Sequence, residues 1–261
     1  MKIALGLEYR GANYLGWQRQ KDGPTIQACV EDALSKVANT VIQVHSAGRT
    51  DTGVHALQQV IHFETGVDRK PRSWVLGGNV HLPVDISLIW ARPVPDTFHA
   101  RFSATGRTYH YLILNRPSRP GLYSGMVTWD HRSLDEQRMR DAAVCLLGEH
   151  DFTSFRALQC QAKSPVRTVR RLEIRRRGEF IMLEIEANAF LHHMVRNIAG
   201  VLMAIGAGKE RVEWAGEVLK LQDRTRGGVT APADGLYLAG VDYPAEYDLP
   251  VRHDSAWFQT R

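Results

Sequence analysis

The order of hydrophobic patterns along the chain constrains its fold most strongly. In the first half, alternating apolar residues predict strands and helical spacing predicts helices, in the order strand, helix, strand, strand, helix, strand. The same order returns after residue 106, although the two halves show no clear repeat of individual residues. Two β-α-β-β-α-β halves indicate an α+β protein built from two ferredoxin-like units. The expected strands are 2–9, 41–44, 57–63, 85–92, 107–114, 166–176, 180–187 and 235–241, and the expected helices are 26–37, 71–79, 133–148, 190–205 and 212–221.

Short polar signals mark several boundaries of these elements. Thr25 is placed to cap the first helix, and the run from Ser133 to Glu136 has the form of a capping box. Gly178 separates two strands that we expect to pair as a hairpin. The proline-rich break at 93–96 predicts two domains, residues 1–103 and 104–261. We expect the tail from 244 to 261, which lacks periodicity, to be loosely held.

The composition narrows the class of protein. Hydrophobic residues make up 44% of the 261-residue chain and charged residues 23%, which is ordinary for a soluble globular protein. No stretch approaches the ~20 apolar residues of a membrane span, and the charged start does not resemble a secretory signal. Three cysteines without a Cys-x-x-Cys pair argue against a disulfide framework and a zinc ribbon. These features predict a cytoplasmic protein that binds neither membrane nor metal.

Arginines are concentrated in one expected strand. The net charge of +5 and the pI near 9.2 point weakly to an anionic partner. Six arginines fall within eleven residues, and this density is unfavourable unless the side chains are solvated or face phosphates. A merely soluble sheet edge is the structural alternative, but arginines also recur across 101–140, which favours a nucleic-acid surface. The six are Arg167, Arg170, Arg171, Arg175, Arg176 and Arg177.

The loop from Ala47 to Ala56 has the composition of a site. Two glycines bracket an arginine, an aspartate and two threonines, which gives a tight bend with short polar side chains. An ordinary surface turn is the alternative. Arg49 stands two residues before Asp51, where its guanidinium can keep the carboxylate ionised and can also reach a phosphate or a base.

This loop, Gly48-Arg49-Thr50-Asp51-x-Gly-Val-His-Ala, resembles the catalytic loop of the tRNA pseudouridine synthase A family (TruA). The resemblance implies that Asp51 is the catalytic nucleophile and that Arg49 takes the place of a flipped nucleotide. By itself, the sequence supports an exposed aspartate with an arginine beside it.

Four further segments resemble the family in the same order. The stretch 98–104 leads into a strand whose Tyr109 would pack on the target uracil, and 148–156 resembles an RNA-facing turn. The segment 188–197 is similar to the helix whose arginine, here Arg196, pairs with the catalytic aspartate. Leu236 would close the apolar side of the base pocket. Each also has a structural interpretation, because Tyr109 and Leu236 could be core residues and Arg196 a solvated one.

The resemblance also implies an architecture and a reaction. Two α/β domains would join their antiparallel sheets into one extended sheet crossed by an RNA-binding cleft. The expected activity is isomerisation of uridine to pseudouridine at positions 38, 39 and 40 of the tRNA anticodon stem-loop, by a homodimer without a cofactor. Two other classes stay open from the residues alone. A glycoside hydrolase or nucleosidase would need a second carboxylate about 5 to 10 Å away, and a noncatalytic RNA-binding module would explain only the arginines.

Overall fold

The chain divides into two compact units in the computed structural model, which describes residues 1–250. The first unit comprises Met1–Thr105 and the stretch that begins at Tyr237, and the second comprises Gly106–Leu236. The first crossing lies close to the expected boundary at 103. The chain crosses again after Leu236, so the last strand does not belong with the unit expected to span 104–261. It returns because β10 (Leu236–Asp242) pairs in parallel with β3 (His55–Glu64).

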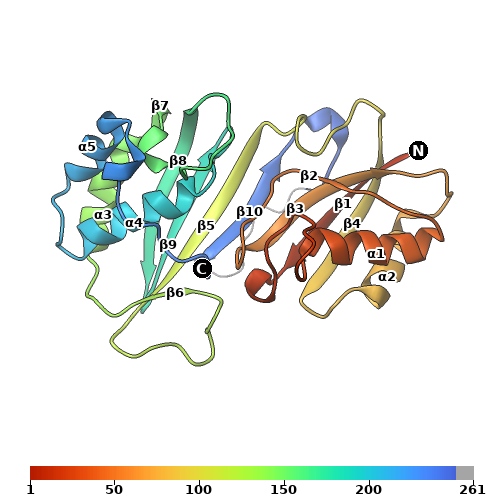
Figure 1. Cartoon of the computed structure of the whole chain (residues 1–261), viewed down its shortest axis with the longest axis horizontal. Coiled ribbons are helices and arrows are strands. Elements are labelled where there is room, and N and C mark those ends of the chain that lie inside the picture. Colours follow the sequence, from red (N-terminus) through yellow and green to blue (C-terminus); the bar gives the residue numbers. More distant parts are fainter. Residues whose placement is uncertain (251–261) are drawn as a thin grey trace. The chain divides into compact units, whose positions relative to one another are not determined.

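The first unit has the expected order of elements. Besides β3, these are β1 (Lys2–Tyr9), α1 (Ile26–Ala38), β2 (His45–Ser46), α2 (Pro71–His81) and β4 (Ile86–Val94). Strands β4, β1 and β3 form an antiparallel sheet, and β2 and β10 both pair with β3 (Figure 1).

The central strand β1 is buried on both faces of this sheet. Ile3, Leu5 and Leu7 alternate along β1 and are almost fully buried. The ring of Phe63 meets Trp74 of α2 edge to face, with 5.0 Å between the ring centroids. Thr25 caps α1 as expected, because its hydroxyl accepts a hydrogen bond from the backbone N–H of Ala28 at 3.4 Å.

The strand expected at 41–44 does not form. Ile42 and Val44 are buried, but their backbone N–H groups donate to side chains of α1. Ile42 N–H bonds Ser35 Oγ at 2.9 Å, and Val44 N–H bonds Glu31 Oε1 at 3.1 Å. The hydrogen bonds that a strand would supply are therefore made by the helix, and pairing with β3 begins only at β2.

The second unit contains the expected hairpin and helices together with two short strands that the sequence did not predict. Its elements are β5 (Gly106–Asn115), β6 (Thr128–Asp130), α3 (Glu136–Ala143), β7 (Gly148–Asp151), β8 (Val166–Arg177), β9 (Phe180–Ala187), α4 (Met194–Gly206) and α5 (Trp214–Leu221). Strands β5, β9, β8 and β7 are neighbours in that order, and each pair is antiparallel. Gly178 has a φ of +58°, as a tight hairpin turn requires.

Two helix starts differ from the expectation. The cap of α3 is Asp135 rather than Ser133, because Asp135 Oδ1 accepts from the backbone N–H groups of Gln137 and Arg138. Helix α4 begins at Met194 instead of residue 190, since His193 has the left-handed φ of +63°. The α+β class is confirmed. Within residues 1–250 no helix is both long and apolar enough to cross a membrane.

The end of the chain falls partly outside the described residues. A short 3-10 turn at Ala245–Tyr247 follows β10. Of the tail 244–261 that we expect to be loosely held, residues 251–261 lie outside the described part.

Candidate active site

The loop between β2 and β3 carries Arg49 and Asp51, and its backbone is anchored at several points. Thr50 C=O accepts from Trp17 N–H at 2.9 Å, and Asp51 C=O accepts from Val54 N–H at 3.1 Å. Gly53, with a φ of +79°, donates to Tyr14 C=O at 3.4 Å. These bonds fix the backbone on both sides of the Asp51 side chain.

Two buried side chains of the sheet make hydrogen bonds to the start of the loop. Tyr9 of β1 shares a hydrogen bond of 2.8 Å with the hydroxyl of Thr50. The amide of Gln59 donates to Gly48 C=O at 2.7 Å and accepts from Gly48 N–H at 3.4 Å. Burial raises the pKa of Tyr9 to about 12, so this hydroxyl stays neutral at physiological pH.

Side chains in the loop alternate between the interior and the solvent. Thr50 is only 6% exposed, whereas Arg49 is exposed and Asp51 is half-buried. The buried threonine therefore sets the direction of its two charged neighbours. This geometry is that of a presented carboxylate and guanidinium rather than of a freely moving surface turn.

The segment from Gly11 to Trp17 packs directly against the loop. A Cβ on Gly16, whose φ is +92°, would lie 2.6 Å from Thr50 O, and a Cβ on Gly11 would lie 2.0 Å from Val54 O. Both positions therefore require glycine. Trp17 of this segment is buried. The contact of this segment with the Asp51 loop has no signal in the sequence.

His55 connects the end of the loop to β10. Its Nδ1 accepts from Gly11 N–H at 3.0 Å, and its ring stacks on Tyr237 with centroids 4.6 Å apart. Tyr237 and His55 are also partners in the parallel ladder. His55 therefore has a structural role, because it joins the end of the loop to Gly11 and to β10.

In the second unit, Tyr109 and Leu236 differ in exposure. Tyr109 is half-buried on β5, with its ring edge to face with Phe190 at 4.9 Å. Tyr111, two residues later, is the fully buried tyrosine of this strand. Leu236 is 6% exposed at the start of β10. Of the two expected pocket residues, Tyr109 thus has the more accessible side chain.

Arg196 fixes the segment that follows α5. Its Nε donates to Ala231 C=O at 2.8 Å, and Ala231 N–H donates back to Arg196 C=O at 3.1 Å. Asn197 strengthens this attachment by accepting from Thr230 Oγ1 at 2.6 Å and from Arg224 Nη2 at 3.1 Å. The guanidinium of Arg196 is thus oriented by a backbone carbonyl, which the sequence did not reveal.

Arg170 and Arg171 lie at a β-bulge of β8. The register with β9 shifts between Val169 and Arg171, which makes Arg170 the extra residue. Arg171 Nη2 contacts Glu184 at 2.8 Å and Glu186 at 3.6 Å, and Arg170 lies 3.6 Å from Glu186. Both expected RNA-binding arginines therefore already have acidic neighbours on β9.

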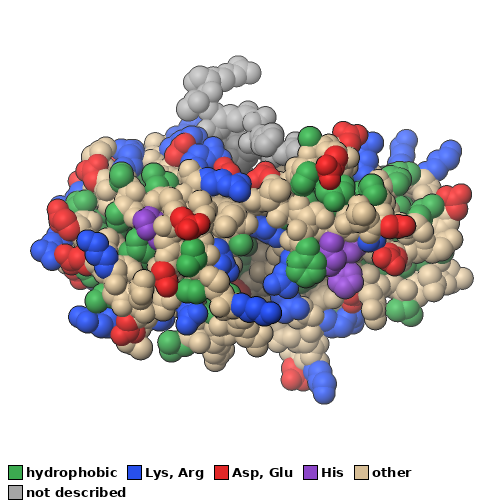
Figure 2. Space-filling model, turned by 90° about the horizontal axis from the view of Figure 1, so that it is seen from above, with side chains coloured by type: hydrophobic (Ala, Val, Ile, Leu, Met, Phe, Trp, Pro, Cys, Tyr) green, Lys and Arg blue, Asp and Glu red, His purple; other side chains and the backbone are tan. Residues whose placement is uncertain are grey.

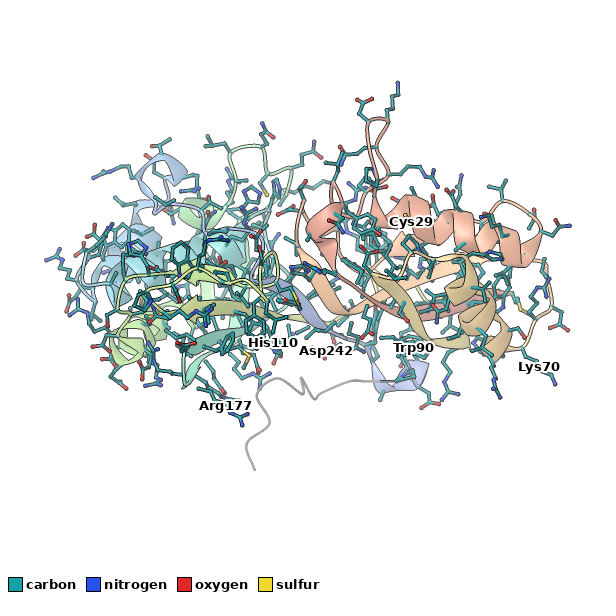
Figure 3. The ribbon with its side chains drawn as sticks, turned by 90° about the horizontal axis from the view of Figure 1, so that it is seen from below. Cys29, Lys70, Trp90, His110, Arg177 and Asp242 are labelled. Carbon is teal, nitrogen blue, oxygen red and sulfur yellow. The ribbon has the colours of Figure 1, made fainter. Side chains whose placement is uncertain are left out.

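These arginines share a sheet face with His110, not with Tyr109. His110 Nε2 lies 3.1 Å from Glu184, the carboxylate that Arg171 also contacts, and the hydrogen bond to His110 holds the pKa of Glu184 below its usual range. His110 is labelled in Figure 3. Because adjacent residues of a strand point to opposite faces, Tyr109 points the other way. The sequence could not reveal this separation, because the bulge changes the alternation.

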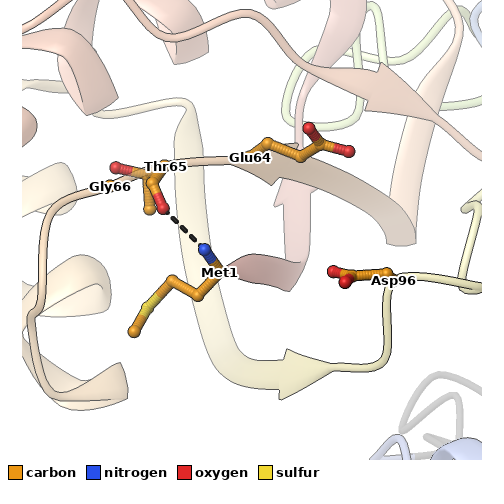
Figure 4. Close-up of a pocket in the computed structure, with 5 residues that line it drawn as sticks. All are labelled: Met1, Glu64, Thr65, Gly66 and Asp96. Atoms are coloured by element: carbon orange, nitrogen blue, oxygen red, sulfur yellow. Dashed lines mark hydrogen bonds between the residues drawn. The ribbon is translucent and has the colours of Figure 1, made fainter.

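One pocket of the first unit is unrelated to the loop. It has a volume of about 480 Å³ and lies at the start of β1, where the Met1 amino group donates to Thr65 C=O at 2.8 Å (Figure 4). Glu64 and Asp96 contribute carboxylates to its lining. The pocket contains none of the expected site residues.

The surface charge is mixed. Figure 2 shows Lys and Arg side chains distributed over the visible face with Asp and Glu between them. On β8, Arg175 pairs with Glu173, and Arg176 pairs with Glu136 at 2.8 Å. Part of the arginine run is therefore neutralised locally.

Comparison with known proteins decides the family. A family model described as tRNA pseudouridine synthase matches residues 7–103 and 142–244. The chain belongs to this family. A tRNA pseudouridine synthase A from Pseudomonas aeruginosa is 58% identical over 97% of this chain and 89% of the relative. Proteins of the same name are 57% identical in Methylococcus capsulatus, over 95% and 92% of the two chains, and 55% identical in Photorhabdus laumondii, over 96% and 95%.

Family membership also decides the class of activity. The chain is an isomerase of tRNA modification that forms pseudouridine. The glycosidase and the noncatalytic RNA-binding module, which the residues alone left open, are therefore not supported. Both segments matched by the family model include predicted site residues, namely Arg49 and Asp51 in the first and Arg170, Arg171, Arg196 and Leu236 in the second.

Proposed function

We propose that this enzyme isomerises uridines 38, 39 and 40 in the anticodon stem-loop of tRNA, with Asp51 as the nucleophile. The observation that carries the proposal is the loop in which buried Thr50 and three backbone hydrogen bonds fix the position of half-buried Asp51. Such preorganisation is what a reaction at one fixed atom requires.

The chemistry needs only a carboxylate and proton transfers. The bond between N1 of uracil and C1′ of ribose breaks, the detached base turns, and a bond from C5 to C1′ forms. The proton leaves C5 and N1 gains one, so the product is an isomer and no oxidant or reductant is consumed. Asp51 would form a transient covalent bond to one of the two separated parts of the nucleoside, and this bond would break again once C5 is joined to C1′.

Arg49 has the second role in this proposal. A uridine must leave the helical stack before it can react, which costs a few kcal/mol. An exposed guanidinium next to the nucleophile can fill the vacated space and contact neighbouring phosphates. The anchored backbone at Thr50 would keep Arg49 from following the base into the pocket.

The resemblance to the family assigns roles in the reaction to three residues of the second unit. Arg196 would pair with Asp51 and favour its ionised form. Tyr109, whose ring is partly accessible, would stack on the uracil. Leu236 would close the apolar side of the pocket. A homodimer would then share one tRNA, since tRNA is longer than one such subunit.

The test is incubation of the protein with unmodified tRNA in the absence of any added cofactor, followed by nucleoside analysis. We expect pseudouridine at positions 38, 39 and 40. The matched variant is Asp51→Asn, which keeps the size of the side chain and removes its charge. Failure of the wild-type protein to form pseudouridine at these positions would overturn the proposed substrate positions.

A further inference from the structure

Phe102 is a solvent-exposed aromatic side chain on a rigid segment of the first unit. It is 76% exposed, whereas Phe98 and Ala100 of the same segment are fully buried. Large apolar side chains that are exposed in this way often mark binding surfaces when their neighbours have suitable chemistry.

The backbone around Phe102 is fixed by hydrogen bonds. His99 Nδ1 accepts from the N–H groups of Arg101 at 3.1 Å and of Phe102 at 3.4 Å. Ser103 Oγ accepts from His99 N–H at 3.0 Å, and Ala100 N–H donates to the buried His62 at 3.1 Å. The backbone that carries the phenyl ring is therefore already ordered, which lowers the entropy cost of binding.

The neighbours of the ring are cationic or hydrogen-bond donors. The imidazole of His99 lies 4.3 Å from the ring of Phe102, and the guanidinium carbon of Arg101 lies 5.6 Å from its centroid. Because Nδ1 of His99 accepts two hydrogen bonds, the proton of the neutral ring is on Nε2, which is then a donor. Histidine side chains beside an exposed hydrophobic one are visible on the face shown in Figure 2.

We propose that the Phe102 platform, defined as Phe102, Arg101 and His99, stacks an unpaired base of the tRNA substrate. The phenyl ring would cover the base, and Arg101 would face the adjacent phosphate. This inference rests on tRNA being the substrate and adds a binding site that is separate from the Asp51 loop in sequence.

The charge of the platform favours RNA over a second copy of this chain. Arg101 provides positive charge, both Arg101 and His99 provide hydrogen-bond donors, and no carboxylate belongs to the platform. Every base has a π-face, and stacking on aromatic residues beside basic groups is a common way to bind unpaired nucleotides. A second copy carries the same net charge of +5 and is therefore the less complementary partner.

The experiment compares tRNA binding by three variants at one fixed salt concentration, measured by anisotropy of labelled unmodified tRNA. Phe102→Leu, which keeps apolar bulk but removes the π-face, should weaken binding by about tenfold. Phe102→Trp should bind within about twofold of wild type because it retains a stacking surface. Val84→Ala removes another exposed apolar side chain of the first unit and should leave binding unchanged. Unchanged affinity of a folded Phe102→Leu variant would overturn the platform.

Sedimentation and kinetics separate the other outcomes. If Phe102→Leu changes the oligomeric state while tRNA affinity per assembled enzyme is retained, the surface belongs to a second copy and the proposal is wrong. If tRNA contacts the platform, KM should rise and kcat at saturating tRNA should stay close to wild type. Active wild-type enzyme with an unaffected Phe102→Leu variant would refute only the platform, whereas inactive wild-type enzyme would refute the proposed function.

Discussion

Tyr9 and Thr50 share a buried hydrogen bond of 2.8 Å that joins the first strand to the residue immediately before Asp51. The bond connects the rigid sheet to the loop without involving either charged side chain of the loop. Tyr9 is therefore a positioning residue for Asp51 in the proposed mechanism.

Removing the hydroxyl of Tyr9 should lower kcat and should lower the free energy of unfolding only slightly. Tyr9→Phe should cost about 1 kcal/mol of unfolding free energy, as expected for one hydrogen bond, and lower kcat because the loop loses an anchor. Tyr243→Phe removes a hydrogen bond of 2.6 Å to Ala100 C=O and serves as the control. Denaturant unfolding and single-turnover kinetics measure the two effects. Equal kcat in both variants would mean that Tyr9 does not position Asp51.

Asp51→Asn should abolish pseudouridine formation and leave tRNA affinity nearly unchanged. The carboxylate acts on one nucleoside, whereas binding is distributed over many phosphate contacts. Nucleoside analysis and anisotropy of labelled tRNA provide the two readouts. Near-normal turnover of the variant would exclude Asp51 as the nucleophile, and Asp68→Asn is a control outside the loop.

The fold was predictable where local signals agree with burial. The alternation of β1 and the cap at Thr25 both correspond to observed contacts. The strand predicted at 41–44 was wrong. Ile42 and Val44 show the apolar alternation of a strand, but their N–H groups donate to side chains of α1. Strands β6 and β7, of three and four residues, are too short to give a periodic signal.

The sequence motif predicted the two charged residues of the candidate site but not the residues that support them. The loop composition singled out Arg49 and Asp51, but the supports beneath them come from distant residues. Tyr9 and Gln59 read as ordinary strand positions, and their contacts with Thr50 and Gly48 depend on the tertiary fold. The bulge that sets the direction of Arg170 has no sequence signature of its own.

Arg196→Lys separates two functions of that arginine. A lysine keeps the positive charge that would favour ionised Asp51 but cannot reproduce the Nε bond to Ala231 C=O. We expect Arg196→Ala to lower turnover because it removes the proposed cationic partner of Asp51. Arg196→Lys should recover part of this loss. If neither variant changes the pH profile of kcat, Arg196 acts only through Ala231.

His62 should make the protein less stable in mild acid. Burial, together with the nearby His99, His45 and Lys2, lowers the pKa of His62 to about 3. In the unfolded chain His62 binds a proton near pH 6.5, whereas in the folded chain it binds one only near pH 3. The free energy of unfolding therefore falls as the pH drops from 6.5 to 3, and His62 has no effect on it above this range. From pH 7 to pH 5 the loss is about 2 kcal/mol.

The variant His62→Asn tests this origin. Asparagine can still accept from Ala100 N–H but does not titrate, so its unfolding free energy should fall less between pH 7 and pH 5 than that of wild type. Urea unfolding at both pH values gives the difference, and His81→Asn on α2 is the control. An identical pH dependence of wild type and His62→Asn would contradict the assignment.

The last prediction concerns how the enzyme accepts three neighbouring uridines. Reading base edges would fix one register, whereas phosphates look alike from one step to the next, so recognition by shape and charge allows several registers. Neutralising Arg170 and Arg171 together should then weaken modification at positions 38, 39 and 40 alike. It should also reduce the salt dependence of tRNA binding.

The single variants of Arg170 and Arg171 should differ in stability and in the salt dependence of binding, because the two arginines have different acidic contacts. Arg171 contacts Glu184 at 2.8 Å beside buried His110, so Arg171→Gln should lower stability as well as binding. Arg170, the bulge residue, is 44% exposed and 3.6 Å from Glu186, so Arg170→Gln should chiefly reduce the slope of log K against log salt, by about 1 for one phosphate contact. Arg211→Gln removes an arginine that pairs with Glu217 on the surface and is the control. Loss of modification at one position alone would show that these arginines read local sequence, because a backbone contact cannot distinguish the three uridines.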